Sequence, residues 1–111
     1  MVSIVITAYN VEKYIAQAIH SALQQTHKDL ECVIVEDCST DNTLAEIKRA
    51  ILNDERVHIL ENRENIGAGA SRRKGIEATK GDYILLLDGD DWIEPDFIEV
   101  LYKKAIESGA E

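Results

Sequence analysis

Apolar and polar positions along the chain follow two different periods, and the two kinds of segment take turns. Four short segments are almost continuously apolar and rich in β-branched residues, which is typical of strands buried on both faces of a parallel sheet. They cover residues 2–7, 31–36, 57–60 and 83–87. After each of them, apolar residues recur every three or four positions, as on one face of a helix. These helices are expected over residues 11 to about 25, 43 to about 52, 67–78 and from 95 onward.

Residues at the expected helix ends support this division. Asn10 precedes the first helix and is a favourable N-cap residue. Thr43 and Glu46 have the spacing of a capping box at the start of the second helix. Gly81 suits the left-handed residue that follows a helix end, and Pro95 suits the first turn of the last helix.

The alternation predicts an α/β fold of the Rossmann-like type, because parallel strands joined by right-handed helical crossovers form a sheet with helices on both faces. For about four strands, we expect the doubly wound order 3-2-1-4. The chain then reverses its direction of travel across the sheet between the first and the fourth strand. Open α/β sheets bind ligands in the crevice at such a reversal. We expect Tyr9 and the acidic residues after the last strand to border it.

Composition fits one small globular domain. The chain has 111 residues, of which 45% are hydrophobic and 30% are charged, and these values argue against disorder. The formal net charge is −9, so the surface as a whole repels nucleic acid and anionic membranes. A phosphate-containing ligand would therefore need a cation or a local basic patch.

The two cysteines, Cys32 and Cys38, lack the spacing of metal ligands. We expect both thiols to be reduced, as in a cytoplasmic protein. No apolar run reaches transmembrane length, and the chain begins on a strand-like segment without a charged leader and cleavage site. These features favour a cytoplasmic location.

Three carboxylates directly follow the last apolar strand. Asp88, Asp90 and Asp91 surround Gly89, and such a cluster cannot be buried without partners because desolvating isolated charges is costly. A divalent cation would balance them: Mg²⁺ and Mn²⁺ prefer oxygen ligands, and Mg²⁺ is often held by one or two carboxylates together with substrate phosphates. The alternative is a polar loop that caps the next helix, and an Asp-x-Asp triplet alone does not decide between the two.

The loop after the first strand, residues 7–10, has neither a Gly-x-Gly-x-x-Gly fingerprint nor a P-loop. A metal ion at Asp88 and Asp90 would therefore have to neutralise a diphosphate bound here. Tyr9 could stack on a base, or it could pack at the strand end.

The loops after the second and third strands offer further polar groups. Asp37 could accept hydrogen bonds from a base or a ribose, while Ser39 or Asp41 could cap the next helix. Small residues from Gly67 onward are followed by Arg72 and Arg73. Arginine is suited to planar recognition of a base or a phosphate, although a solvated basic patch is the simpler interpretation, especially for Arg73.

Taken together, four segments resemble the N-terminal half of a family 2 glycosyltransferase with the GT-A fold. They are residues 2–10, 33–43, 64–76 and 86–92, in the order and with the spacing of that family. The resemblance covers essentially the whole chain, residues 1–111. It implies that the chain is the portion of a GT-A domain that binds a nucleoside diphosphate sugar, with a UDP-sugar favoured.

The resemblance also implies roles for individual residues. Thr7 and Tyr9 would border the base, Asp37 would hydrogen-bond it, and Arg72 would flank it. Asp88 would face the ribose, and Asp90 would bind Mn²⁺ or Mg²⁺ on the diphosphate, with Asp88 and Asp91 as further candidate ligands. The motif positions to which the resemblance assigns these roles are Thr7, Tyr9, Asp37, Arg72, Asp88, Asp90 and Asp91.

The chain departs from the family pattern at four positions and in length. Glu36 stands for a common Asp, Cys38 for a common Gly, Ser71 for a common Ala and Arg73 for a common Asn. Family members continue for at least as many residues again, and that part supplies the acceptor site and the catalytic base of inverting members. We therefore expect no catalytic base in this chain, and donor binding without transfer.

The full-length protein would transfer sugar to a saccharide or lipid-linked acceptor and could be membrane-associated. This chain alone should self-associate as a dimer, through the apolar edge of the last strand or through the last helix. A sugar-phosphate nucleotidyltransferase would need a glycine-rich basic loop after the first strand, which is absent from residues 7–10. A non-catalytic nucleotide-binding module remains the other alternative; a receiver-like regulatory domain would need a phosphorylatable acid and a lysine at strand ends that the sequence does not offer.

Overall fold

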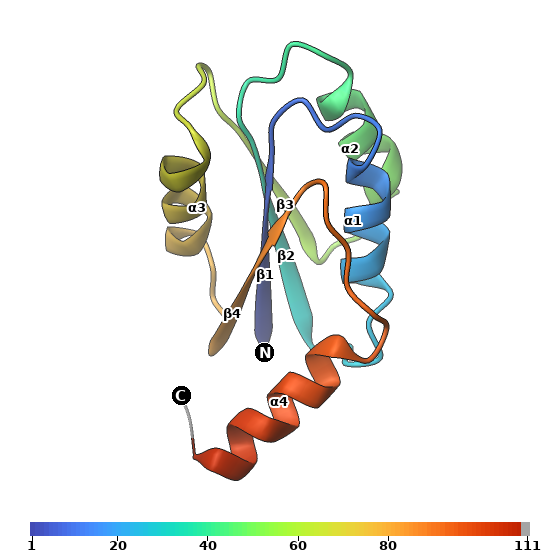
Figure 1. Cartoon of the computed structure of the whole chain (residues 1–111), viewed down its shortest axis with the longest axis vertical. Coiled ribbons are helices and arrows are strands. Elements are labelled where there is room, and N and C mark those ends of the chain that lie inside the picture. Colours follow the sequence, from blue (N-terminus) through green and yellow to red (C-terminus); the bar gives the residue numbers. More distant parts are fainter. Residues whose placement is uncertain (110–111) are drawn as a thin grey trace.

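The four strands form one parallel sheet in the order β3-β2-β1-β4 (Figure 1). The strands are β1 (Val2–Ala8), β2 (Leu30–Glu36), β3 (Val57–Glu61) and β4 (Tyr83–Asp88). This computed structural model describes residues 1–109. The predicted order 3-2-1-4 is confirmed, and each expected strand lies within one or two residues of its observed bounds.

Helices cover both faces of the sheet, as predicted. Two of them, α1 (Ile15–Leu23) and α2 (Thr43–Ile51), lie on one face, and α3 (Ala68–Glu77) lies on the other (Figure 1). The last helix, α4 (Phe97–Ser108), crosses the end of the sheet at which the strands begin. Connecting loops lie at the opposite end of the sheet, where the strands finish.

The core follows from the central position of β1, whose side chains alternate between two covered faces. Ile4 and Ile6 point to the face of α1 and pack with Ile15 and Ile19, and all four are fully buried. Burying such a side chain contributes roughly 1.5–3 kcal/mol. Val5 points to the opposite face, where it meets α3. The central strand is therefore held from both sides.

Helix α3 approaches the sheet closely because it carries glycine at the contact. A Cβ atom on Gly75 would overlap the side chain of Val5 and lie 3.0 Å from Cγ2 of Val35. Gly69, on the same helix, has no atom within 4 Å of the position that its Cβ would take. Close packing thus requires glycine at only one of the two positions.

Two expected helix starts differ from the prediction. The first helix begins at Ile15 instead of Val11, because Asn10 adopts a left-handed backbone (φ 51°) and its side chain accepts the Thr40 N–H instead of capping α1. The expected capping box of α2 is absent. The Thr43 hydroxyl donates to the Asp41 carboxylate, and Oε1 of Glu46 forms an ion pair with Nη1 of Arg49 at 3.3 Å.

Pro95 and Gly81, which were expected at helix ends, also have different positions in the structure. The last helix begins at Phe97, so Pro95 lies before its first turn. Gly81 is not the left-handed residue after α3, which ends at Glu77. It is required for space, because a Cβ on Gly81 would lie 2.8 Å from the Met1 carbonyl oxygen and 2.8 Å from the Ser3 nitrogen.

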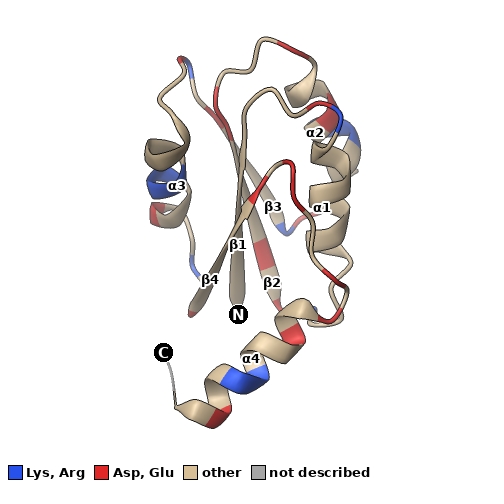
Figure 2. Cartoon of the chain, in the orientation of Figure 1, with Lys and Arg blue, Asp and Glu red and all other residues tan. Residues whose placement is uncertain are grey.

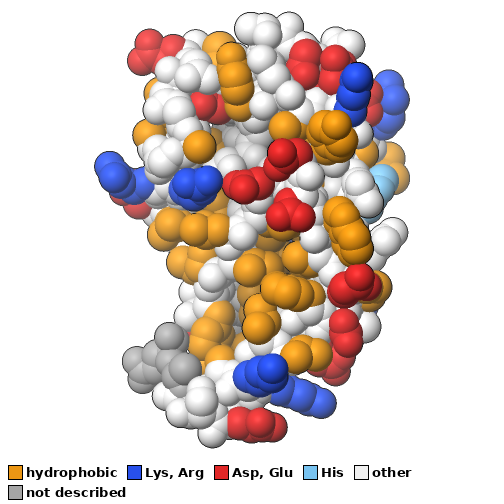
Figure 3. Space-filling model, viewed as in Figure 1, with side chains coloured by type: hydrophobic (Ala, Val, Ile, Leu, Met, Phe, Trp, Pro, Cys, Tyr) orange, Lys and Arg blue, Asp and Glu red, His pale blue; other side chains and the backbone are white. Residues whose placement is uncertain are grey.

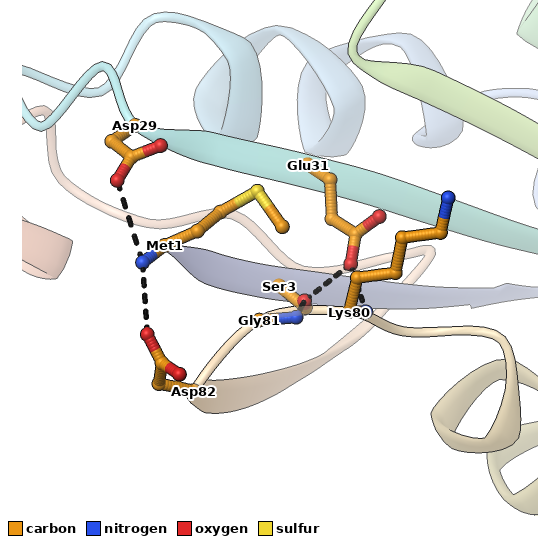
Figure 4. Close-up of polar contacts among 7 residues, drawn as sticks. All are labelled: Met1, Ser3, Asp29, Glu31, Lys80, Gly81 and Asp82. Atoms are coloured by element: carbon orange, nitrogen blue, oxygen red, sulfur yellow. Dashed lines mark hydrogen bonds and ion pairs between the residues drawn. The ribbon is translucent and has the colours of Figure 1, made fainter.

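Gly81 belongs to a polar cluster that joins the starts of β1, β2 and β4 (Figure 4). The buried Glu31 carboxylate accepts hydrogen bonds from the Ser3 hydroxyl (2.6 Å) and from the Lys80 N–H, while the Gly81 N–H donates to the Ser3 oxygen (2.8 Å). Burial alone would raise the pKa of Glu31, but these hydrogen bonds lower it below the usual value. The cluster therefore satisfies a buried charge.

Both cysteines are free thiols, as predicted: Cys32 is buried in β2 and Cys38 is exposed. Burial raises the pKa of the Cys32 thiol to about 12. Within residues 1–109, no helix has the length and apolar character needed to cross a membrane.

Replacing Gly75 by alanine should destabilise the fold by about 1–3 kcal/mol, because overpacking forces β1 and α3 apart. Gly69→Ala is the matched control and should stabilise α3 by roughly 0.5–1 kcal/mol, since its methyl group meets open space and alanine is the better helix former. Urea unfolding of the two variants measures both effects. Equal changes in the two variants would contradict the packing argument.

Candidate nucleotide-binding site

A cleft of about 410 Å³ lies where the strands end, between the loops after β1, β2 and β4 and the start of α3. The structure brings together six of the seven residues predicted for the site, and these line the cleft: Thr7, Tyr9, Asp37, Arg72, Asp88 and Asp90. Asp91 is exposed and is not among the lining residues. The predicted convergence of distant loops is therefore present.

Asp37 is held in place by donors from the β3–α3 connection. Its side chain is only 3% exposed. One carboxylate oxygen accepts the Ile66 N–H (2.8 Å) and the Asn62 amide (2.9 Å), and the other accepts the Gly67 N–H (3.0 Å). Burial opposes its ionisation, but these hydrogen bonds lower the pKa of Asp37 below its ordinary value. Asp37 is thus a fixed, ionised acceptor.

The β1–α1 loop is fixed by side chains of the β2–α2 loop. The Ser39 hydroxyl accepts the Asn10 N–H (3.0 Å), the Thr43 hydroxyl accepts the Val11 N–H (2.9 Å), and a carboxylate oxygen of Asp41 accepts the Glu12 N–H at 3.3 Å. The other oxygen of Asp41 accepts the Thr43 N–H at the start of α2 (2.9 Å). The side chains of Ser39, Asp41 and Thr43 therefore hold the backbone of the β1–α1 loop in position.

The same loop presents Tyr9 and Thr7 to the cleft. Tyr9 is 46% exposed although it is aromatic, so its ring is free to contact a ligand. Thr7 is the last residue of β1 paired with β4, opposite Asp88. Both residues therefore lie where the prediction put them, on the side of the cleft formed by β1.

Cys38 stands at a strained position beside Asp37. Its φ of 58° is left-handed, which costs a residue with a Cβ roughly 1–2 kcal/mol. Glycine, which is common at this position in the resembling family, adopts such a backbone without this cost. The replacement of glycine by Cys38 therefore has an energetic cost in this fold. The Cys38 thiol makes a long contact of 3.6 Å to the Arg63 carbonyl oxygen.

The acidic loop is shaped by Gly89. Its N–H donates to the Thr7 carbonyl (2.8 Å), and a Cβ there would lie 2.8 Å from that same oxygen. The Asp91 N–H then closes a turn onto the Asp88 carbonyl (3.0 Å), and the Asp91 side chain accepts the Trp92 N–H at 2.9 Å. Asp88 and Asp90 consequently project from the turn, whereas Asp91 bonds to the backbone beside it.

Arg72 lies across the cleft from the acidic loop. Its Nη2 is 3.5 Å from Oδ1 of Asp88, and both side chains are partly solvated. Figure 2 shows basic residues on α3 and acidic residues along the loop after β4. An exposed pair at this distance contributes little stability, so Arg72 can turn toward a ligand at small cost.

The donor set fits a metal only in combination with a ligand. No group of three or more histidine, cysteine, aspartate or glutamate side chains in the described chain could hold an ion. Asp88 and Asp90 supply two carboxylates, which is the number that Mg²⁺ commonly uses when substrate phosphates complete its coordination. These two residues could therefore hold Mg²⁺ or Mn²⁺ against a diphosphate.

Sequence reasoning missed several residues of the site. Asn65 and Gly67 line the cleft, and the Asn62 amide donates a hydrogen bond to Asp37. Asn62 directly follows β3, so a polar residue at a strand end was a usable signal. Gly67 adopts φ 89°, which glycine tolerates.

The fold and the cleft define an α/β ligand-binding domain of the doubly wound class. Comparison with known proteins agrees: the family model described as "Glycosyl transferase family 2" matches residues 3–111. The chain belongs to glycosyl transferase family 2.

Relatives and solved structures extend this result. The chain is 38% identical over 110 residues to glycosyltransferase GlyA from Streptococcus pneumoniae serotype 4, covering 99% of the chain and 16% of GlyA. It is 43% identical over 104 residues to chondroitin synthase from Pasteurella multocida strain Pm70, covering 94% and 11%. The crystal structure of Staphylococcus aureus TarS 1-349 in complex with UDP-GlcNAc has a TM-score of 0.87 at 28% identity, covering 96% of this chain and 31% of TarS. The GT-A fold is thereby confirmed, and the chain spans less than a third of each of these proteins.

Asp37→Asn should destabilise the protein at pH 7 by about 1.5–3 kcal/mol, the range for hydrogen bonds to a charged group. Because the folded-state pKa of Asp37 is lowered, its stabilisation is complete above the unfolded-state pKa of about 3.9 and is lost as pH falls through the folded-state value. The difference between wild type and variant should therefore shrink below about pH 3.9.

The control for this experiment is Asp96→Asn, because Asp96 is exposed and its side chain makes no capping hydrogen bond. Its effect should stay within about 0.5 kcal/mol. Denaturant unfolding between pH 7 and pH 3 measures all three proteins. A pH-independent loss in Asp37→Asn would show that ionisation of Asp37 is irrelevant to stability.

Proposed function

We propose that this chain is the donor-binding part of a glycosyltransferase that transfers a sugar from a nucleoside diphosphate sugar to an acceptor hydroxyl. The observation that carries the proposal is the convergence of Asp37, from the loop after β2, with Asp88 and Asp90, from the end of β4 and the loop after it, on one cleft at the switch point of the sheet. Membership of glycosyl transferase family 2 supports it. TarS, which shares the fold at 28% identity, was solved with UDP and with UDP-GlcNAc.

The base would bind between Tyr9 and Asp37. Asp37 lines the cleft, and Ile66, Asn62 and Gly67 donate to its carboxylate from the protein side. From the cleft side, the carboxylate would accept an imide N–H such as that of uracil. Thr7 and the exposed Tyr9 ring would border the base, and Arg72 would flank it. A UDP-sugar is the favoured donor because TarS, which shares the fold, was solved with UDP and with UDP-GlcNAc.

The ribose and the diphosphate would lie toward the acidic loop. Asp88 would accept hydrogen bonds from ribose hydroxyls, and Asp90, with Asp88, would hold Mn²⁺ or Mg²⁺ on the diphosphate. The ion would supply stabilisation of negative charge on the leaving nucleoside diphosphate. Arg72 can add positive charge, since its contact with Asp88 is long and solvated.

Transfer would also require a base that deprotonates the acceptor hydroxyl. We assign this role to no residue of the chain and propose that it lies in the part of the full-length protein that the relatives contain beyond this region. The acceptor would be a saccharide or a lipid-linked molecule. This chain by itself should bind the donor without transferring the sugar.

A divalent ion and a nucleoside diphosphate should bind cooperatively, because each neutralises charge that the other adds. Calorimetric titration with UDP and with GDP, in Mn²⁺ and then in chelator, measures this. Asp90→Ala should abolish the effect of Mn²⁺ on nucleotide affinity. Asp37→Ala should weaken nucleotide binding and leave the metal dependence intact.

The control for these titrations is Asp96→Ala, which removes the same charge from an exposed position outside the cleft. It should leave both the affinity and its metal dependence unchanged. Nucleotide binding that is insensitive to chelator would count against the metal bridge. Identical behaviour of Asp37→Ala and Asp90→Ala would contradict their separate roles.

We also propose that the isolated chain self-associates through β4. Beside β4, on the side away from β1, no strand is present in the described part of the chain. Ile84 and Leu86 are 43% and 46% exposed, and Figure 3 shows hydrophobic side chains gathered over β4 between α3 and α4. Residues 83–87 carry no charge that would discourage pairing with another chain. A symmetric dimer with two β4 edges paired would cover this surface.

Sedimentation at several concentrations should therefore show a dimer in the micromolar range. Leu86→Lys places a charge on the apolar surface beside the edge and should shift the equilibrium to monomer. Leu52→Lys is the control, because Leu52 is an exposed leucine after α2, away from β4. A strict monomer at high micromolar concentration, or equal effects of the two substitutions, would refute the edge-to-edge dimer.

A further inference from the structure

A buried asparagine connects Asp37 to helix α3. Asn62 follows β3 and is 8% exposed. Its amide nitrogen donates to Asp37 Oδ1 (2.9 Å) and lies 3.2 Å from the Ser71 hydroxyl oxygen, and its carbonyl oxygen accepts from the Lys74 ammonium at 2.6 Å. Ser71 is fully buried. The network therefore runs from an exposed lysine, through two buried polar groups, to the acceptor in the cleft.

The lysine fixes the orientation of the asparagine. An ammonium group can only donate, so the Asn62 carbonyl must face Lys74 and the Asn62 NH₂ must face Asp37. A flipped amide would place a carbonyl oxygen against the Asp37 carboxylate and turn NH₂ toward the ammonium. Without Lys74, nothing in this network opposes that flip except the carboxylate itself. Lys74 and the Asp37 carboxylate together thus fix the orientation of the Asn62 amide.

Ser71 adds to the same effect. Since its oxygen accepts from Asn62, its proton is free to point to Asp37, and a hydrogen bond from Ser71 contributes to the lowered pKa of that carboxylate. Donors from Asn62, Ser71 and the backbone at residues 66 and 67 thus surround the carboxylate on its protein side. The cleft side is the remaining direction in which Asp37 can accept.

We infer that Lys74 and Asn62 are positioning residues that keep Asp37 aligned as an acceptor, and so make the cleft select bases with an imide N–H. The inference rests on the proposed nucleotide binding. Uracil N3–H and guanine N1–H are such donors, whereas the corresponding ring nitrogens of cytosine and adenine are acceptors and would face the carboxylate unfavourably. Lys74 acts through Asn62 and need not touch the ligand.

A simpler role would be a tie between β3 and α3 without any effect on recognition. The two roles differ in one measurable respect. A positioning role affects only ligands that donate to Asp37, whereas a structural or purely electrostatic role affects all nucleoside diphosphates alike. Methylation of the imide nitrogen removes the donor while keeping the base, the ribose and the diphosphate.

Affinities of UDP and N3-methyl-UDP should therefore be measured for wild type, Lys74→Met and Arg73→Met. If GDP is the nucleotide that binds, GDP and N1-methyl-GDP take their place. Arg73 is the matched control, because it is the exposed neighbour on α3, lies outside the cleft lining and carries the same charge. Lys74 is exposed as well, so neither substitution opens the core, and thermal melting verifies that all proteins are folded.

We expect Lys74→Met to weaken UDP binding about 3- to 10-fold, the effect of one net hydrogen bond, and to leave the weaker binding of N3-methyl-UDP unchanged. Arg73→Met should alter both ligands by the same small factor. Lys74→Arg, which keeps a cationic donor, should retain more of the discrimination than Lys74→Met.

Three other results would overturn the inference in distinguishable ways. Equal weakening of both ligands by Lys74→Met, or no weakening of either, would reduce Lys74 to a structural or electrostatic role. Wild-type binding that ignores methylation would show that the base does not donate to Asp37, while leaving nucleotide binding itself intact. Failure of wild type to bind any nucleoside diphosphate would instead refute the proposed function.

Discussion

The last two carbonyl groups of β1 accept the hydrogen bonds on which the cleft depends. The Thr7 carbonyl accepts the Gly89 N–H (2.8 Å) from the loop after β4, and the Ala8 carbonyl accepts the Asp37 N–H (2.9 Å) from the loop after β2. One step further out, the Glu36 carbonyl accepts the Asn62 N–H at 2.9 Å. The parallel ladder thus continues past each strand end into the loops. Because β1 lies between β2 and β4, one strand fixes both acidic loops at once.

This arrangement separates the polar residues into two groups. The side chains of Ser39, Asp41 and Thr43 accept hydrogen bonds from backbone N–H groups of the β1–α1 loop. The side chain of Asp91 accepts one from the Trp92 N–H. Asp88 and Asp90 instead line the cleft. The pattern explains why a polar cluster in the sequence holds both structural and ligand-facing groups, and why position in the motif alone does not distinguish them.

The sequence was sufficient for the sheet and for the convergence of the site, because both follow from local apolar runs and a general rule of chain travel. It was insufficient where a residue has a distant partner. Asn10 and Gly81 both carry ordinary local signals, for a cap and for a helix end. Their actual roles are set by Thr40 and by the backbone of Ser3, which are remote in sequence. Local propensity is a weak prior that tertiary contacts override.

Asn62 was missed for a related reason. Its partner Asp37 lies 25 residues away in the sequence, and the connection from β3 to α3 brings the two together at the end of β2. There its backbone at Ile66 and Gly67 and its side chain at Asn62 all reach Asp37. A buried carboxylate such as Asp37 needs several hydrogen-bond donors, and the nearest connection must supply them. This requirement is the signal that could have revealed Asn62.

Charge sets the remaining constraint on the proposed ligand. Two like charges roughly 4 Å apart repel by about 1 kcal/mol in water and about 4 kcal/mol at the effective dielectric of a protein surface. Asp88 and Asp90 would repel a diphosphate to that degree, in a chain whose net charge is already −9. Arg72 is the basic residue of the cleft lining, and it already lies beside Asp88. A cation between the two sets of oxygens would offset this repulsion, and the metal and the nucleotide would then each increase the affinity for the other.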